Sequence, residues 1–207
     1  MSSREQRGSP PELSLVGSYS QRTHACLKQL QQMGAGVDMT SDVRFPNKLY
    51  NRIKRQNVDA QLAFVQENLR HLRHLYRHGN LSRLGWNVEP FLITLHSQIF
   101  YLQDCVSTNQ SESSELNRYY SRLENSIVRR TNGSLSSWQT INNITVHHLY
   151  RLNSLVLSIR DATAKGRHGN QTAPERTTTR IGTAFKRTAK RLTRPQTHHH
   201  HRENNRV

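Results

Sequence analysis

The sequence predicts an all-α fold, a bundle of five helices within one domain. Apolar residues recur at steps of three and four along four segments, as they do on one face of an α-helix. No segment keeps the alternation of apolar and polar residues that marks a strand. The 207 residues suit one domain with tails, since domains commonly span roughly 100–200 residues. We expect helices at 21–33, 58–78, 88–105, 113–130 and 137–161.

Both ends of the chain are expected to lie outside the bundle, which we place at 21–162. Residues 1–20 are polar and contain Pro10 and Pro11, and we interpret them as mostly disordered. They contain no run of roughly 7–15 apolar residues, so no signal peptide is visible. Residues 163–207 are rich in Gly, Thr, Arg and His and predict a basic, disordered tail.

The first expected helix, 21–33, is short, with Leu27, Leu30 and Met33 on one stripe and glycines directly after it. A connection of more than twenty residues separates it from the next helix. One long crossover after a short first helix indicates an up-up-down-down bundle.

The second expected helix, 58–78, has the clearest pattern in the chain. Asn57 is placed to cap its first turn, and Gly79 ends it. Its apolar stripe consists of Val58, Leu62, Val65, Leu69, Leu72 and Tyr76.

The last three helices present similar stripes. Asn87 can cap the helix at 88–105, and Pro90 falls in its first turn, where a missing N–H costs little. The helix at 137–161 begins at Ser136-Ser137-Trp138-Gln139, which we interpret as a capping box. The expected core contains Leu62, Val65, Leu69, Leu92, Leu95, Ile99, Leu123, Leu152 and Leu155.

No pattern in the sequence indicates catalysis or a cofactor. There is no Gly-rich phosphate loop, nucleophile elbow or pair of carboxylates in an apolar setting, so we expect no enzyme. His74 and His78 have the i, i+4 spacing of a helical metal pair, and His71 lies one turn before His74. No nearby carboxylate or cysteine completes a tetrahedral site, so we predict no metal and a solvated basic face.

Longer stretches of the sequence resemble a known family. Phe45-Pro46-Asn47-Lys48-Leu49-Tyr50, Asp59-Ala60-Gln61-Leu62-Ala63-Phe64-Val65 and Leu75-Tyr76-Arg77-His78-Gly79-Asn80-Leu81-Ser82 are similar to the first connection and second helix of fish type I interferons. The resemblance extends over about residues 22–162. It implies a helical cytokine bundle that binds two different class II cytokine receptor chains and induces antiviral genes through receptor-associated kinases.

The same resemblance bears on the two cysteines, Cys26 and Cys105. From the residues alone they can be two buried free thiols or a pair. The resemblance to single-disulfide fish interferons implies a bridge from the first helix to the end of the helix at 88–105. It would close a loop of about 80 residues, worth roughly 4 kcal/mol in the chain-entropy model.

The resemblance also implies two receptor-binding faces, assigned by element. One combines the connection after the first helix with the helix at 137–161, and the other uses the three helices between them. Candidates on the first face are Arg44, Lys48 and Arg52 in the connection, and His147, Arg151 and Ser154 on the last helix.

Five Asn-X-Ser/Thr triplets suggest glycosylation and therefore a secreted protein. Asn80, Asn109 and Asn132 fall between expected helices and are the better candidates, whereas Asn143 lies within one. The family resemblance likewise implies an extracellular location. An intracellular form is the alternative, because no signal peptide is visible.

The strong positive charge supports a second functional hypothesis. The formal net charge is +16, and residues 163–207 contain eleven Lys and Arg against two Glu. The tail could bind heparan sulfate or another polyanion, which makes a basic anion- or nucleic-acid-binding protein the alternative function. No nucleic-acid-binding motif is present, so no specific nucleic acid is expected. No stretch approaches the roughly 18 apolar residues of a membrane span.

Overall fold

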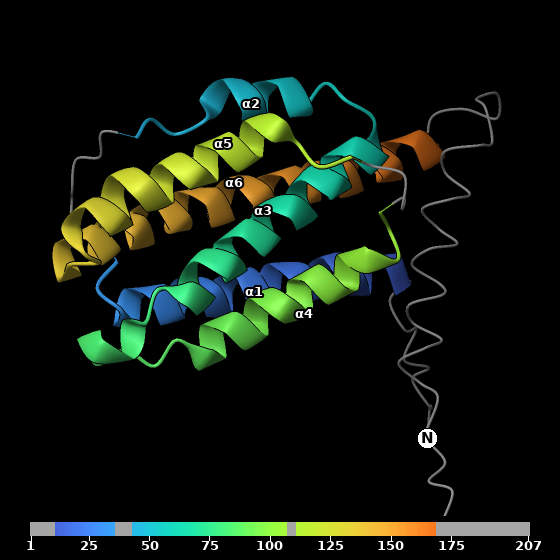
Figure 1. The fold of residues 1–207 in the computed structure, drawn as a ribbon. Helices are drawn as coiled ribbons and strands as arrows, with labels where there is room; N and C mark the ends of the chain where they lie inside the picture. Colours follow the sequence, from blue (N-terminus) through green and yellow to red (C-terminus); the bar gives the residue numbers. More distant parts are fainter. Residues whose placement is uncertain (1–10, 36–42, 107–110, 169–207) are drawn as a thin grey trace, which may run out of the picture.

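The computed structural model describes residues 11–35, 43–106 and 111–168, which form helices and turns without a strand (Figure 1). The predicted all-α class is confirmed. Two short turns of other helix types, η2 (Glu124–Val128) and η3 (Arg129–Thr131), continue α5, and η1 (Leu81–Leu84) follows α3. The six α-helices of this described part are α1 (Pro11–Gln32), α2 (Asn47–Ile53), α3 (Val58–His78), α4 (Glu89–Gln103), α5 (Ser114–Leu123) and α6 (Leu135–His168).

The helices run in the predicted up-up-down-down order. Figure 1 shows α1 and α3 running in one direction and α4 and α6 in the other, with α5 beside α6 and antiparallel to it. The crossover from α1 to α3 passes over the top of the bundle in this view and contains α2. None of the helices described is long and apolar enough to cross a membrane.

The first helix begins ten residues earlier than expected. Residues 11–20, which we predicted to be disordered, are helical, so that prediction was wrong for them; residues 1–10 lie outside the described part. Tyr19 is buried, and the Ser20 hydroxyl donates a hydrogen bond to Asn153 Oδ1 on α6 at 2.8 Å. Packing against α6 therefore supports this added part of α1.

The connection after α1 contains α2, which the sequence analysis did not predict. Its seven residues bury Leu49 and Tyr50 against the bundle. A helix this short is marginal by itself because nucleating the first turn is costly. Tertiary contacts, rather than sequence periodicity, hold it in place.

The helix ends agree with the predictions in part. The Asn57 side chain accepts a hydrogen bond from Ala60 N–H at 2.8 Å, and Gly79 ends α3, as predicted. The start of α6 differs from the predicted capping box, because Ser134 Oγ accepts the bond from Ser137 N–H at 3.3 Å and the helix begins at Leu135. Its far end extends to His168, beyond the predicted residue 161.

Eight of the nine predicted core residues are buried, and Ile99 is half-buried at the edge of the core. Buried polar groups in the same core are bonded between helices. Tyr76 Oη lies 2.7 Å from Asn142 Oδ1 on α6, and Asn142 Nδ2 donates to the Met33 carbonyl at 2.7 Å. Leaving one such group unpaired costs about 1–3 kcal/mol, so these bonds fix how α1, α3 and α6 align.

The end of α3 is covered by Trp138 of α6, which has no exposed surface. A Cβ atom on Gly79 would lie 2.3 Å from Trp138 Cζ2, closer than any two such atoms can approach. The Tyr76 ring lies 5.4 Å from the indole, between centroids. Glycine is therefore required at position 79 for the indole to seat against α3.

We predict that replacing Leu95 by Ala lowers the free energy of unfolding by about 2–5 kcal/mol, because Leu95 is fully buried and the change leaves a cavity. Ile93 on the same helix is 59% exposed, so Ile93→Ala is the matched control and should cost less than about 0.5 kcal/mol. Urea unfolding followed by circular dichroism measures both. Equal losses in the two variants would contradict the core assignment.

Candidate functional site

The position of α2 is set by hydrogen bonds to one buried histidine. His148 on α6 has no exposed surface. Its Nδ1 lies 2.7 Å from the Tyr50 hydroxyl of α2, and its Nε2 lies 2.8 Å from the Tyr119 hydroxyl of α5. A neutral imidazole has one donor and one acceptor nitrogen, so one tyrosine accepts and the other donates. A single side chain thus joins three helices.

The environment of His148 keeps its imidazole neutral. Burial, together with the neighbouring His147 and Arg151, lowers the pKa of His148 to about 3. Burial also raises the pKa of Tyr50 well above its usual value, so the hydroxyl keeps its proton. Both partners therefore stay uncharged at neutral pH, which suits a hydrogen bond in an apolar setting.

Phe45 and Arg151 cover the contact between α2 and α6 on its outer side. The Phe45 ring stacks on His147 with centroids 3.8 Å apart and on Tyr50 at 5.3 Å. The Arg151 guanidinium lies 4.9 Å from the centroid of the Tyr50 ring and donates to Asn47 Oδ1 at 3.1 Å. Arg151 therefore combines a cation–π contact with a hydrogen bond to the first residue of α2.

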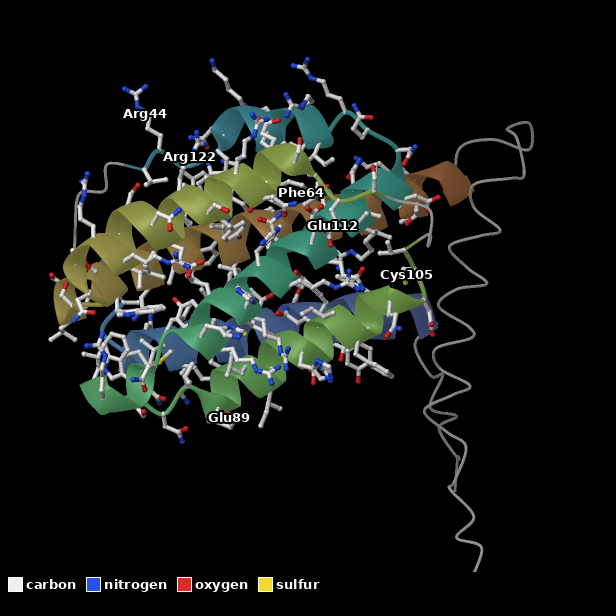
Figure 2. All side chains as sticks on the ribbon, in the orientation of Figure 1. Arg44, Phe64, Glu89, Cys105, Glu112 and Arg122 are labelled. Atoms are coloured by element: carbon white, nitrogen blue, oxygen red, sulfur yellow. The ribbon has the colours of Figure 1, made fainter. Side chains whose placement is uncertain are left out.

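The predicted receptor residues come from these two elements, and we call them the α2–α6 face. Arg44, Lys48 and Ser154 are exposed, and Figure 2 shows Arg44 projecting outward from the segment before α2. Arg52 is exposed and forms an ion pair with Glu115 of α5, so part of its charge is used within the molecule. The face consists of Arg44, Lys48, Arg52, His147, Arg151 and Ser154.

The structure brings part of this set together. Phe45, directly after Arg44, contacts His147, and Asn47, directly before Lys48, is bonded to Arg151. Ser154 lies one turn further along α6 from Arg151. Arg52 lies at the opposite end of α2, beside α5. The result is a cationic surface built on a short helix and one face of α6.

The two cysteines are not brought together, and both are free thiols. Gln98 Nε2 of α4 donates to Tyr19 O and Thr23 Oγ1 of α1, which aligns residue 98 with residues 19–23. The helices are antiparallel (Figure 1), so Cys26, three residues after Thr23, is displaced toward the start of α4. Cys105 follows the end of α4, where Figure 2 labels it.

At a rise of 1.5 Å per residue, this displacement separates the cysteines by roughly 15–20 Å along the helix axes. A disulfide needs Cα atoms within about 7 Å. The bridge that the family resemblance implied is therefore not formed in this structure. Burial raises the pKa of each thiol to about 12.

The remaining predicted sites lie on the surface. Asn80 and Asn132 are exposed and have positive φ values of 46° and 52°, whereas Asn109 lies outside the described residues. His71 stacks on Tyr120, and the rings of His74 and His78 lie 4.2 Å apart at a tilt of 35°. Among the residues described, no group of three or more His, Cys, Asp or Glu could hold a metal ion.

Sequence reasoning missed His148, although a signal was present. Position 148 is four residues before Leu152 and seven before Leu155, so it falls on the apolar stripe of α6. A histidine at such a position is buried and needs hydrogen-bond partners. Tyr50 and Tyr119 could not be matched to it from spacing, since they lie 98 and 29 residues away.

Comparisons with known proteins agree on one family. The model of the interferon alpha/beta domain matches residues 15–159. Interferon a3 of Oncorhynchus mykiss is 29% identical over 141 residues, covering 66% of this chain and 80% of that protein. The structure of zebrafish interferon 1 is similar with a TM-score of 0.57 at 25% identity, covering 69% of this chain and 97% of that one.

We predict that His148 makes stability depend on pH. Between about pH 3 and 6.5 the unfolded chain binds a proton at this imidazole and the folded chain does not, so stability falls as the pH falls. Lowering the pH from about 7.5 to 5 should cost about 2 kcal/mol through this group.

The measurement is urea unfolding at both pH values for the unmodified protein and for His148→Gln. Other titrating groups are common to the two proteins, so the difference in pH dependence isolates His148. The variant should lose less stability on acidification, whatever its stability at neutral pH. An equal loss in both proteins would contradict the prediction.

Proposed function

The chain belongs to the interferon alpha/beta family as a fish type I interferon, and on this premise we propose that it brings two different class II cytokine receptor chains together. It is a cytokine and not an enzyme. Kinases attached to the receptor chains would then start antiviral gene expression. Members of the family are secreted, which supports an extracellular site of action for this chain.

The α2–α6 face is proposed as the surface for the first receptor chain. The observation that carries this proposal is the double contact of Arg151, which holds α2 against α6 through Asn47 and Tyr50. A surface arranged before binding loses less conformational entropy on association. Arg residues at the centre of an interface often contribute most of its binding energy.

The second receptor chain is proposed to bind α3, α4 and α5. Support comes from α4, where Ile93 is 59% exposed and Phe100 is 46% exposed. Two large apolar side chains on one exposed helix face can serve as anchors for a partner. Of these helices, α4 lies across the bundle from α2, whereas α5 lies beside it (Figure 1), so a receptor chain bound on the α4 side leaves the α2–α6 face free.

Asn80 and Asn132 are proposed as glycosylation sites. The two turns that hold them lie close together, because Arg83 Nη2 donates to the Asn132 carbonyl at 2.8 Å and to the Gly133 carbonyl at 2.6 Å. Glycans there would occupy one end of the bundle. Asn132 lies just before the start of α6, whereas the α6 residues of the α2–α6 face lie near the middle of that helix.

The alternative function, polyanion binding by residues 163–207, remains a prediction, since most of that tail lies outside the described residues. Heparan sulfate or another extracellular polyanion would be its partner. Removing residues 169–207 separates the two functions. Loss of anion binding with full antiviral signalling would assign the cytokine function to the bundle.

We predict that Arg151→Ala lowers affinity for the first receptor chain by about tenfold or more, as for a central interface residue. Lys165→Ala removes one exposed cation from the same helix, away from the face, and is the matched control. Surface plasmon resonance against each receptor chain, with an interferon-responsive reporter, measures the effect. Unchanged affinity in Arg151→Ala would overturn the assignment of this face.

We predict that expression in secretory cells gives glycans on Asn80 and Asn132. Each of Asn80→Gln and Asn132→Gln should lower the mass by one glycan, while Asn143→Gln, within α6, should leave it unchanged. Mass spectrometry before and after enzymatic deglycosylation measures this. A glycan on Asn143, or none on the other two, would contradict it.

A further inference from the structure

A basic hollow lies between α3 and α4, outside the α2–α6 face. Its volume is about 390 Å³. In Figure 2, nitrogen-bearing side chains gather along the junction of these two helices. We call it the α3–α4 groove, and its lining consists of Arg70, Arg73, His74, Arg77, His78, His96 and Ile99.

The arginines of the α3–α4 groove have no carboxylate partner among the residues that the structure describes. Arg70, Arg73 and Arg77 follow one another at steps of three and four, so they form one row over about 10 Å of α3. Within the described part of the chain, none of the three forms an ion pair with a carboxylate. Like charges at these spacings repel one another and destabilise a helix.

Arg73 is the most informative member of the row. Its Nε is buried and has no hydrogen-bond acceptor. A buried donor without an acceptor costs about 1–3 kcal/mol, and more when it is charged. The cost is removed if an anion in the groove displaces the side chains that cover this atom and accepts the bond. The unpaired donor and the row of unneutralised arginines therefore point independently to an external anion.

The side chains that line the α3–α4 groove indicate which kind of anion can bind there. A guanidinium presents two parallel N–H groups that match two oxygens of a sulfate or phosphate group. The groove has no Phe, Tyr or Trp on which a nucleic acid base could stack. A secreted cytokine also encounters sulfated polysaccharides at the cell surface. These properties favour a sulfated polysaccharide over a nucleic acid.

A neighbouring hollow limits where a polysaccharide can bind. Between α3 and α5, the lining combines Arg70, His71 and His74 with Glu67, Glu112 and Glu124, and Figure 2 shows Glu112 on the α5 side of α3. These carboxylates would repel a polyanion. The polyanion is therefore confined to the side of α3 that faces α4.

We propose that the α3–α4 groove binds a sulfated glycosaminoglycan, with Arg70, Arg73 and Arg77 contacting its sulfate groups and Arg73 Nε–H donating to a sulfate oxygen. His74, His78 and His96 line the rest of the groove as further hydrogen-bond donors. This site is in the bundle and differs from the polyanion site predicted for the tail. It lies on the α3 and α4 part of the surface proposed for the second receptor chain, and binding of the polysaccharide can be measured without either receptor.

The test measures binding of a heparin-derived hexasaccharide to the full chain by calorimetry at several salt concentrations. The groove variant is Arg70→Gln/Arg73→Gln/Arg77→Gln. The control is Arg118→Gln/Arg122→Gln/Arg130→Gln, which removes the same charge from exposed positions on and after α5. The tail is present in both, so its contribution cancels. Circular dichroism checks that both variants are folded.

The groove variant should lose about tenfold or more in affinity, since several charge-assisted hydrogen bonds disappear, and the control should lose clearly less. Arg73→Lys keeps the charge but removes Nε–H, and it should also weaken binding. In the unmodified protein, the hexasaccharide should shift the Arg73 Nε–Hε resonance in a nitrogen-15 NMR spectrum.

Three results would overturn the proposal. Equal losses in the groove variant and the control would mean that net charge alone attracts the hexasaccharide. A single-stranded oligonucleotide of equal charge that binds as tightly, with the same loss in the groove variant, would mean that the site does not select a sulfated polysaccharide. An unchanged Arg73 resonance would likewise contradict the assigned contact.

Discussion

The placement of α2 depends on the neutral imidazole of His148. Seven residues cannot form a stable helix alone, and α2 buries only Leu49 and Tyr50. The bond from Tyr50 to His148, and from His148 to Tyr119, ties this segment to α5 and α6 at once. A buried polar group with all its bonds made specifies one arrangement, because any shift would leave it unpaired. The positions of the exposed cations on α2 therefore depend on this buried contact.

Similar buried bonds align the longer helices. The aliphatic stripes of α3, α4 and α6 provide most of the apolar burial, but aliphatic contacts alone tolerate sliding. Gln98 binds the backbone of α1 at Tyr19, and Asn142 binds the carbonyl of Met33 near the end of that helix. With these two points fixed, α1 cannot move along α4 or α6. The bundle therefore combines nonspecific apolar burial with a small number of specific polar contacts.

The sequence predicts the parts of this structure that depend on local pattern. The apolar stripe and the two capping residues predicted α3 correctly at 58–78, because a regular apolar repeat lies between Asn57 and Gly79. The start of α1 and the whole of α2 were missed, since their stability comes from contacts with α5 and α6 that no local pattern records. Arg151 was selected from its helix face, whereas its contacts with Asn47 and Tyr50 join residues about 100 positions apart. The cysteines lie apart because α1 begins ten residues earlier than predicted, so Cys26 is far from the end of α1 that lies beside the end of α4.

The packing of Trp138 on Gly79 affects the intrinsic fluorescence of the protein. The indole is fully enclosed, next to Tyr76, while Trp86 is half-buried beyond the end of α3. An indole shielded from water emits at shorter wavelength than a hydrated one, because surrounding water dipoles relax around its excited state. The two tryptophans therefore give the protein an intrinsic pair of fluorophores, one inside and one near the surface. The blue component of the emission spectrum reports whether α3 and α6 are still in contact, without any added label.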